Sequence, residues 1–148
     1  MFQIKVNFPG AEEILKRRGL EKGGRVQRFF TVRVMTASDK YCPFRSGTLA
    51  HSARISADGC GIEYDQPYAR YHWYGKLMVD KITGKGSFYN PKTGRHFSRP
   101  GVQKELTNRG MNYRGAPLRG PRWVERMWID RGNAICRDIE KYMNGAGQ

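Results

Sequence analysis

A cysteine and a histidine nine positions apart are the side chains of this sequence best suited to covalent chemistry. Cys42 and His51 could form a nucleophilic pair in which the imidazole takes the thiol proton, but no third residue is placed to orient the imidazole. The other two histidines, His72 and His96, are isolated and do not lie at metal-ligand spacing from a cysteine or histidine. We therefore expect no metal site and no cofactor, and the nucleophilic pair stays an open alternative.

Other patterns of catalytic or phosphate-binding residues are not present in the sequence. Gly84-Lys85 does not belong to a phosphate-binding loop, because Val79 stands where the upstream glycine is needed. The close carboxylate pairs, at positions 12–13 and 138–140, fall within amphipathic helical patterns in which a solvated face explains them. The sequence alone therefore favours a protein that is not an enzyme.

Positive charge is concentrated in the middle of the chain. The formal net charge is +14, and residues 65–122 contribute nine of these charges, with twelve Lys and Arg against three acids. A field this one-sided indicates a polyanionic neighbour, either nucleic acid or an acidic protein surface, with a solvated basic face as the alternative. The cations that we expect to face DNA or a partner are Lys81, Lys85, Lys92, Arg95, Arg99, Lys104 and Arg109, followed by Arg114 and Arg119.

Aromatic side chains are densest in residues 64–75. Pro67 suits the first turn of a helix, Asp65 or Gln66 can cap that turn, and Gly75 can end the helix in a left-handed conformation. Helical spacing places three tyrosines roughly on one face, with a tryptophan beside it. Tyr, Trp and Arg dominate interface hot spots, so we expect this helix to form a subunit interface, although any one ring could belong to the core. The expected interface residues are Tyr68, Arg70, Tyr71, Trp73 and Tyr74.

Length and pattern predict one α+β domain over residues 1–148, in which a small antiparallel sheet packs against long helices. No apolar run is long enough for a membrane span, and the N-terminus lacks the pattern of a signal peptide. Cys42, Cys60 and Cys136 are too scattered for a disulfide framework, so we expect reduced, structural cysteines and synthesis in a cytosol.

Local patterns give the expected elements in chain order. Residues 2–8 alternate like a half-buried strand, and residues 11–18 have the charge distribution of a short helix. A longer helix follows Gly23-Gly24, and a turn of helix capped by Ser46 runs to Ser52.

Residues 53–57 and 60–64 flank Asp58-Gly59, which predicts a hairpin with a two-residue type I′ turn. The predicted register sets Ala57 opposite Cys60, Ile55 opposite Ile62 and Ala53 opposite Tyr64. Residues 76–120 show no sustained period, so we expect an irregular basic arm with a small hairpin around residues 87–98. A closing helix that begins at Gly120-Pro121 is expected to pack across the sheet.

Four motifs in order resemble the minor capsid proteins of tailed bacteriophages, among the neck or tail-completion proteins of the head–tail junction. Residues 43–49 form a Pro-x-x-Ser-Gly-x-Leu turn, and residues 53–64 form the strand pair. Residues 67–75 form a Pro-Tyr-Ala-x-x-x-x-Tyr-Gly helix, and Gly-Pro-x-Trp at residues 120–123 begins the closing helix. The resemblance covers most of the chain except residues 76–118.

The resemblance implies a structural virion protein, made in the host bacterial cytoplasm, that forms a homo-oligomeric ring around the DNA channel. Its implied partners are the head–tail connector or adaptor, the tail terminator or tail tube proteins, and packaged DNA bound without sequence specificity. No membrane partner is implied. A small basic nucleic-acid-binding protein, with Tyr68, Tyr71 and Trp73 stacking on bases, is the alternative. A metal-dependent nuclease is a further alternative.

Overall fold

The structure, a computed structural model, describes Lys16 and residues 19–145. The predicted strand over residues 2–8 lies outside the described residues, as does the predicted helix over residues 11–18 apart from Lys16. In chain order the elements are α2 (Arg25–Ser38), α3 (Thr48–His51), β1 (Ala53–Ile55), β2 (Ile62–Tyr64), α4 (Ala69–Tyr74), β3 (Lys76–Asp80), β4 (Phe88–Asn90), β5 (Arg95–Phe97), β6 (Lys104–Gly110) and α5 (Trp123–Met143). Helices combine with small antiparallel ladders, so the predicted α+β class is confirmed.

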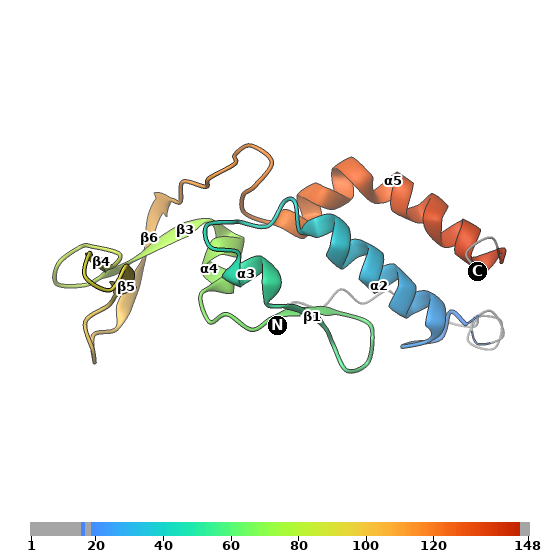
Figure 1. The fold of residues 1–148 in the computed structure, drawn as a ribbon, viewed down its shortest axis with the longest axis horizontal. Helices are drawn as coiled ribbons and strands as arrows, with labels where there is room; N and C mark the ends of the chain where they lie inside the picture. The colour runs from blue at the N-terminus through green and yellow to red at the C-terminus, as the bar shows by residue number, and fades with distance from the viewer. Residues whose placement is uncertain (1–15, 17–18, 146–148) are drawn as a thin grey trace.

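Two parts of the molecule are evident in Figure 1. Helices α2 and α5 lie side by side in one half, and strands β3 to β6 extend from the other half. We call residues 76–110 the arm, and its outer end is formed by β4 and β5 (Figure 1). Among the described residues, none of the helices combines the length and the apolar character that a membrane span requires.

Helices α2 and α5 pack against each other in antiparallel directions. Phe29 stacks on Tyr142 with ring centroids 4.1 Å apart, and Arg33 forms an ion pair with Asp138. The residue that comes later in α2 therefore contacts the residue that comes earlier in α5. The sequence predicted that α5 would pack across the sheet, but the helix lies mainly along α2 and meets the β1–β2 hairpin at its start, where Trp123 contacts Tyr64. The β1–β2 strands have three residues each, which offers too little apolar surface for a 21-residue helix, whereas α2 presents an apolar stripe along its length.

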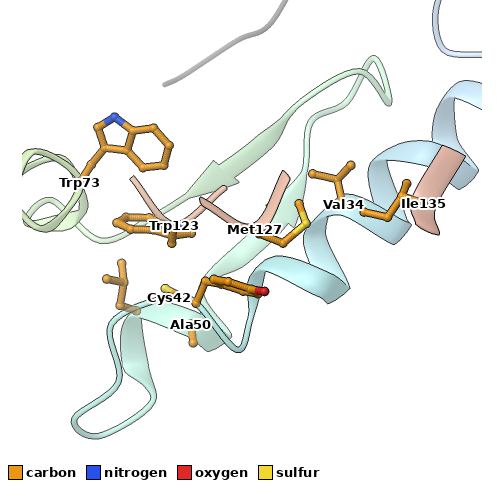
Figure 2. Close-up of a cluster of buried hydrophobic side chains, with 9 residues drawn as sticks. Val34, Cys42, Ala50, Trp73, Trp123, Met127 and Ile135 are labelled. Carbon is orange, nitrogen blue, oxygen red and sulfur yellow. The ribbon is translucent and has the colours of Figure 1, made fainter. Parts of the chain in front are cut away.

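The core lies where the beginning of α5 meets α2, α3 and α4. Figure 2 shows Trp123 and Met127 of α5 among side chains from these helices and from the segment after α2. Trp123 is 1 % exposed and Met127 is fully buried. The other buried members of the cluster are Val34, Tyr41, Cys42, Leu49, Ala50, Trp73 and Ile135. Burial of these large side chains is the main favourable contribution to folding.

The β1–β2 hairpin has the predicted register. Ala53 pairs with Tyr64, Arg54 with Glu63 and Ile55 with Ile62, whereas the expected outermost pair of Ala57 with Cys60 is not part of the ladder. The facing apolar residues therefore fixed the alignment of the two strands, since a slip of one position would exchange their faces.

The turn of this hairpin is not the predicted type I′. That turn needs positive φ at both central residues, and in the loop over residues 56–61 only Gly59 has one, at 74°. Instead the Asp58 carboxylate accepts hydrogen bonds from the Ser56 hydroxyl at 2.6 Å and from the Cys60 N–H at 3.1 Å. These side-chain bonds stabilise a longer loop, which the Asp-Gly pair alone does not reveal.

Helix α3 begins differently from the prediction. Its N-cap is Gly47, with φ 83°, and no side chain caps the helix. The Ser46 hydroxyl lies 2.8 Å from the Thr48 hydroxyl, so Ser46 is not the cap. A Cβ atom at Gly47 would lie 2.8 Å from Cε1 of His51, and a glycine therefore satisfies both the dihedral angle and the close packing.

The arm is ordered and built from two ladders. β3 pairs antiparallel with β6, aligning Met78 with Leu106, and β4 pairs with β5, aligning Phe88 with Phe97. The small hairpin was predicted, but the β3–β6 pairing was not, and residues 111–120 contain no helix or strand, as expected. The β3–β6 pairing joins residues far apart in sequence, which local patterns do not show. The described strands form three separate two-stranded ladders instead of the single sheet that was expected.

Candidate functional site

Helix α4 is held at its end by the segment that leads into α5. Gly75 caps it with φ 71° and donates its N–H to the Tyr71 carbonyl at 2.9 Å, as the sequence predicted. A Cβ atom at Gly75 would lie 3.1 Å from Pro121, so the two segments pack closely here. At the start, Tyr68 occupies the cap position without a side-chain cap, and Asp65 pairs with Arg54 instead of capping the helix.

The aromatic side chains of α4 divide between the core and the surface. Trp73 is 9 % exposed and meets Trp123 edge to face at a centroid distance of 4.9 Å. Tyr74, the next residue, is 60 % exposed, and Tyr68 is 37 % exposed. Trp73 therefore belongs to the core of its own chain, and we remove it from the candidate interface. We call the remaining set of predicted residues the α4 surface: Tyr68, Arg70, Tyr71 and Tyr74.

Arg70 and Tyr71 form one unit on this surface. The Arg70 guanidinium lies 5.3 Å from the centre of the Tyr71 ring, within the range of a cation–π contact. Arg70 is exposed and Tyr71 is half-buried. A flat aromatic ring covered by a cation, with two further tyrosines nearby, is the composition found in protein–protein contacts.

Tyr113 contacts His72 of α4, and the sequence analysis did not identify this residue. Its hydroxyl donates to the His72 carbonyl at 2.8 Å, and the two rings meet at 6.0 Å. Burial raises the pKa of Tyr113 to about 12 and lowers the pKa of His72 below its ordinary value. No local pattern identifies Tyr113, because its partner is 41 residues earlier.

At the base of the arm, Asp80 binds Arg99 through two hydrogen bonds. Nε and Nη2 of Arg99 each lie 2.7 Å from a carboxylate oxygen of Asp80. The Asp80 carboxylate also accepts the backbone N–H groups of Ile82 and Thr83 at 2.8 and 3.0 Å. The Arg99 side chain, helped by these N–H groups, holds the pKa of Asp80 well below its ordinary range. Arg99 therefore stabilises the arm and is not a free cation.

Two further predicted cations also have internal partners. The Lys104 ammonium donates to the Gly86 carbonyl, and Nη2 of Arg109 donates to the Gly84 carbonyl at 3.1 Å. Both bonds join β6 to the loop after β3. Arg109 remains exposed, whereas Lys104 is half-buried.

The other four predicted arm cations are exposed and lie on or beside two turns. We call Lys81, Lys85, Lys92 and Arg95 the arm cations. Within the described part of the chain, no acidic side chain forms an ion pair with any of them. Beyond the arm, Arg114 is exposed, while Arg119 donates to the Cys42 carbonyl at 2.6 Å and covers the Phe44 ring.

The Cys42 and His51 pair is not arranged as a nucleophile and its base. Both residues line a pocket of about 430 Å³, but Cys42 is fully buried and burial raises the pKa of its thiol to about 12. The His51 ring packs edge to face against Phe44. In the part of the chain that the structure describes, no three His, Cys, Asp or Glu side chains cluster as metal ligands would.

Comparison with known proteins supports one family. Searches among curated proteins and among solved structures found no match. A family model described as "Minor capsid protein" matches residues 2–143, which covers nearly the whole chain and includes α4, the arm and α5. The chain therefore belongs to the minor capsid protein family, whose members are structural proteins of the phage virion.

Proposed function

We propose that this minor capsid protein acts in the neck of a tailed phage, as a subunit of a ring around the DNA channel between the head–tail connector and the tail. The observation that carries the proposal is the separation of two unlike surfaces on one chain. The α4 surface carries exposed tyrosines and one arginine, and the arm carries the exposed arm cations. Figure 1 shows α4 beside the body of the molecule and the arm extending away from it.

A ring requires heterologous contacts, in which one patch on a subunit meets a different patch on the next subunit. The α4 surface suits such a contact because Tyr74 and Tyr68 are exposed on a helix that the core holds rigidly through Trp73. Exposed aromatic rings on a fixed support bind a partner with little loss of side-chain freedom. We assign this surface to the contact between neighbouring subunits.

The distribution of positive charge along the chain supports a position of this protein around the DNA channel. Residues 65–122 hold nine of the fourteen excess positive charges, and this segment contains the whole arm. A basic lining neutralises phosphates without reading sequence, which suits a channel through which an entire genome passes. The connector or adaptor on one side and the tail terminator or tail tube on the other are the proposed protein partners.

Electron microscopy of particles made without this gene tests the proposal. Absence of a neck subunit should leave DNA-filled heads separate from finished tails, or heads that have lost their DNA. Infectious tailed particles of normal appearance would contradict the neck position. In that case a nucleic-acid-binding protein is the next candidate, although base stacking could then involve only Tyr68 and Tyr71, because Trp73 is buried.

Substitutions on the α4 surface test the interface separately. Arg70→Glu and Tyr74→Ala should prevent complementation of the deleted gene while the purified protein keeps its unfolding midpoint. Arg131→Glu, which reverses a charge at an exposed position on α5, is the matched control and should complement normally. Equal complementation by all three variants would show that α4 is not an assembly surface.

A further inference from the structure

The seven cations predicted for the arm do not have the same role in the structure. Arg99, Lys104 and Arg109 hold the arm together, whereas the four arm cations are free of acidic partners among the described residues. We infer that the four arm cations, Lys81, Lys85, Lys92 and Arg95, bind the phosphates of double-stranded DNA without sequence preference, and that the other three cations contribute to this binding only by fixing the arm. This inference rests on the proposed position at the DNA channel.

The turn after β3 presents Lys81 and Lys85 on a fixed backbone. The Asp80 N–H donates to the Lys85 carbonyl at 2.8 Å, and the Gly84 N–H donates to the Asp80 carbonyl at 2.8 Å. Arg109 holds the same turn through the Gly84 carbonyl. Hydrogen bonds from Asp80 of β3 and Arg109 of β6 thus hold the turn, while the two lysines on it remain exposed.

The turn between β4 and β5 presents the other two cations. The Asn90 side-chain oxygen accepts the Lys92 N–H at 2.9 Å, and the Asn90 carbonyl accepts the Gly94 N–H at 2.9 Å. Gly94 has φ 64°, which allows the chain to reverse here. Arg95 pairs with Asn90 in the ladder and is the first residue of β5, directly after the turn that contains Lys92.

Acidic side chains near these turns are too few to neutralise them. Residues 81–110 contain seven Lys and Arg and a single acid, Glu105. Cations without internal partners bind a polyanion favourably, because each phosphate contact releases condensed counterions into solution. Among the described residues the arm contains strands and turns and no helix that could enter the major groove, which favours contact with phosphates over the reading of bases.

Apolar side chains are exposed on the arm as well as cations. Phe88 and Phe97 face each other across the β4–β5 ladder and are 38 % and 48 % exposed, and Ile82, Tyr89 and Leu106 are 75 %, 58 % and 53 % exposed. The charge of this segment, with seven Lys and Arg against one acid over residues 81–110, favours DNA as the partner. An acidic protein surface is the competing partner, and the experiment below separates the two.

Binding of the purified full-length chain to a fluorescent DNA duplex of random sequence, followed by anisotropy across a salt series, tests the inference. Four phosphate contacts correspond to a loss of affinity of roughly 100-fold when salt rises from 50 to 200 mM. The variant Lys81→Gln, Lys85→Gln, Lys92→Gln, Arg95→Gln should lose most of this salt dependence. A second duplex of unrelated sequence should bind the unmodified protein equally well.

The matched control removes the same four charges from the body of the molecule. Lys40→Gln, Arg131→Gln, Arg137→Gln, Lys141→Gln changes exposed cations outside the arm and should keep the salt slope close to that of the unmodified protein. If both variants lost the same amount of salt dependence, net charge alone would explain the effect, and the inference would be overturned. Circular dichroism and urea unfolding of both variants confirm that each remains folded.

DNA binding by the arm and the location of the protein at the neck can be contradicted independently. Normal DNA binding by the arm variant, combined with heads that no longer join tails, would overturn the DNA assignment and favour an acidic protein partner. Loss of DNA binding only in the arm variant, with normal necks in the gene deletion, would support the arm as a DNA-binding element and reject the neck position.

Discussion

The indole Nε1 of Trp123 donates a hydrogen bond to the hydroxyl oxygen of Tyr64 over 2.9 Å, and the two rings meet edge to face at 5.3 Å. This contact joins the first residue of α5 to the last residue of β2. Burial raises the pKa of the Tyr64 hydroxyl above its ordinary value of 10.0, because the charged form loses its hydration. The hairpin and the closing helix therefore share one buried polar contact inside an apolar core.

Tyr64→Phe should destabilise the protein because it leaves the Trp123 N–H buried without an acceptor. A buried donor without a partner costs about 1–3 kcal/mol of unfolding free energy. Urea denaturation followed by circular dichroism measures the change. Tyr89→Phe, at a ring that is 58 % exposed, is the control and should change stability by less than about 0.5 kcal/mol. Equal stability of the Tyr64→Phe variant and the unmodified protein would mean that the bond contributes nothing.

Neighbouring aromatic residues on α4 should respond in opposite ways to truncation. Trp73→Ala should cost about 3–5 kcal/mol of unfolding free energy, because it empties a space in the core beside Trp123. Tyr74→Ala should change stability by less than about 0.5 kcal/mol and should impair assembly instead. Urea unfolding and complementation of the gene deletion provide the two measurements. An unfolded Tyr74→Ala protein would place that ring in the core.

Loss of the Asp80 charge should loosen the arm without unfolding the helices. Asp80→Asn removes the charge that Arg99 contacts through two hydrogen bonds, so trypsin should cleave faster after Lys81 and Lys85. The unfolding midpoint of the core should change little. Glu105→Gln removes an exposed acidic charge from β6 and should leave the cleavage rate unchanged. Similar cleavage of all three proteins would show that this ion pair does not order the arm.

The same carboxylate should make the arm sensitive to acid. The folded-state pKa of Asp80 is lowered from its ordinary 3.8, so its stabilising contribution is present above that value and is lost as pH falls through the lowered pKa. The amide proton shifts of Ile82 and Thr83, whose N–H groups bind this carboxylate, report the transition. A titration of these shifts centred at or above the ordinary value would contradict the assignment.

Two of the three cysteines, Cys136 and Cys42, should differ sharply in reactivity. Cys136 is exposed, whereas Cys42 is buried with its thiol pKa raised to about 12. At pH 8 only about one Cys42 thiol in ten thousand is ionised, so an alkylating reagent should modify Cys136 first and Cys42 only after unfolding. Mass spectrometry of digested samples locates the label, and Cys136→Ser removes the fast phase. Rapid labelling of Cys42 in the folded protein would contradict its burial.

Short-range features of the fold were predictable from the sequence, because their causes lie within a few residues. Gly75 marked the end of α4, and the apolar residues of the hairpin fixed its register. Pro67 was expected in the first turn of this helix, but α4 begins two residues later, at Ala69. The shape of the hairpin loop was not predictable in this way. Asp58 there accepts bonds from its neighbours, and the Asp-Gly pair alone does not distinguish this arrangement from a type I′ turn.

Long-range features were not predictable, because one sequence does not reveal which distant segments meet. β3 and β6 carry many polar residues and pair across the β4–β5 hairpin, so the arm was expected to be irregular. For the same reason the sequence placed Arg99 among the free cations, since its partner Asp80 is 19 residues earlier. It also placed Trp73 on a surface, although helix phase directs this side chain toward Trp123.

The perpendicular contact of Trp73 with Trp123 also gives the protein an intrinsic optical signal. Two indoles at 4.9 Å couple electronically, so their near-ultraviolet circular dichroism depends on α4 remaining docked against the start of α5. The third tryptophan, Trp128, is 41 % exposed, and its fluorescence is therefore open to aqueous quenchers. Docking of α4 and the environment of α5 can thus be followed separately in unlabelled protein, including during incorporation into particles.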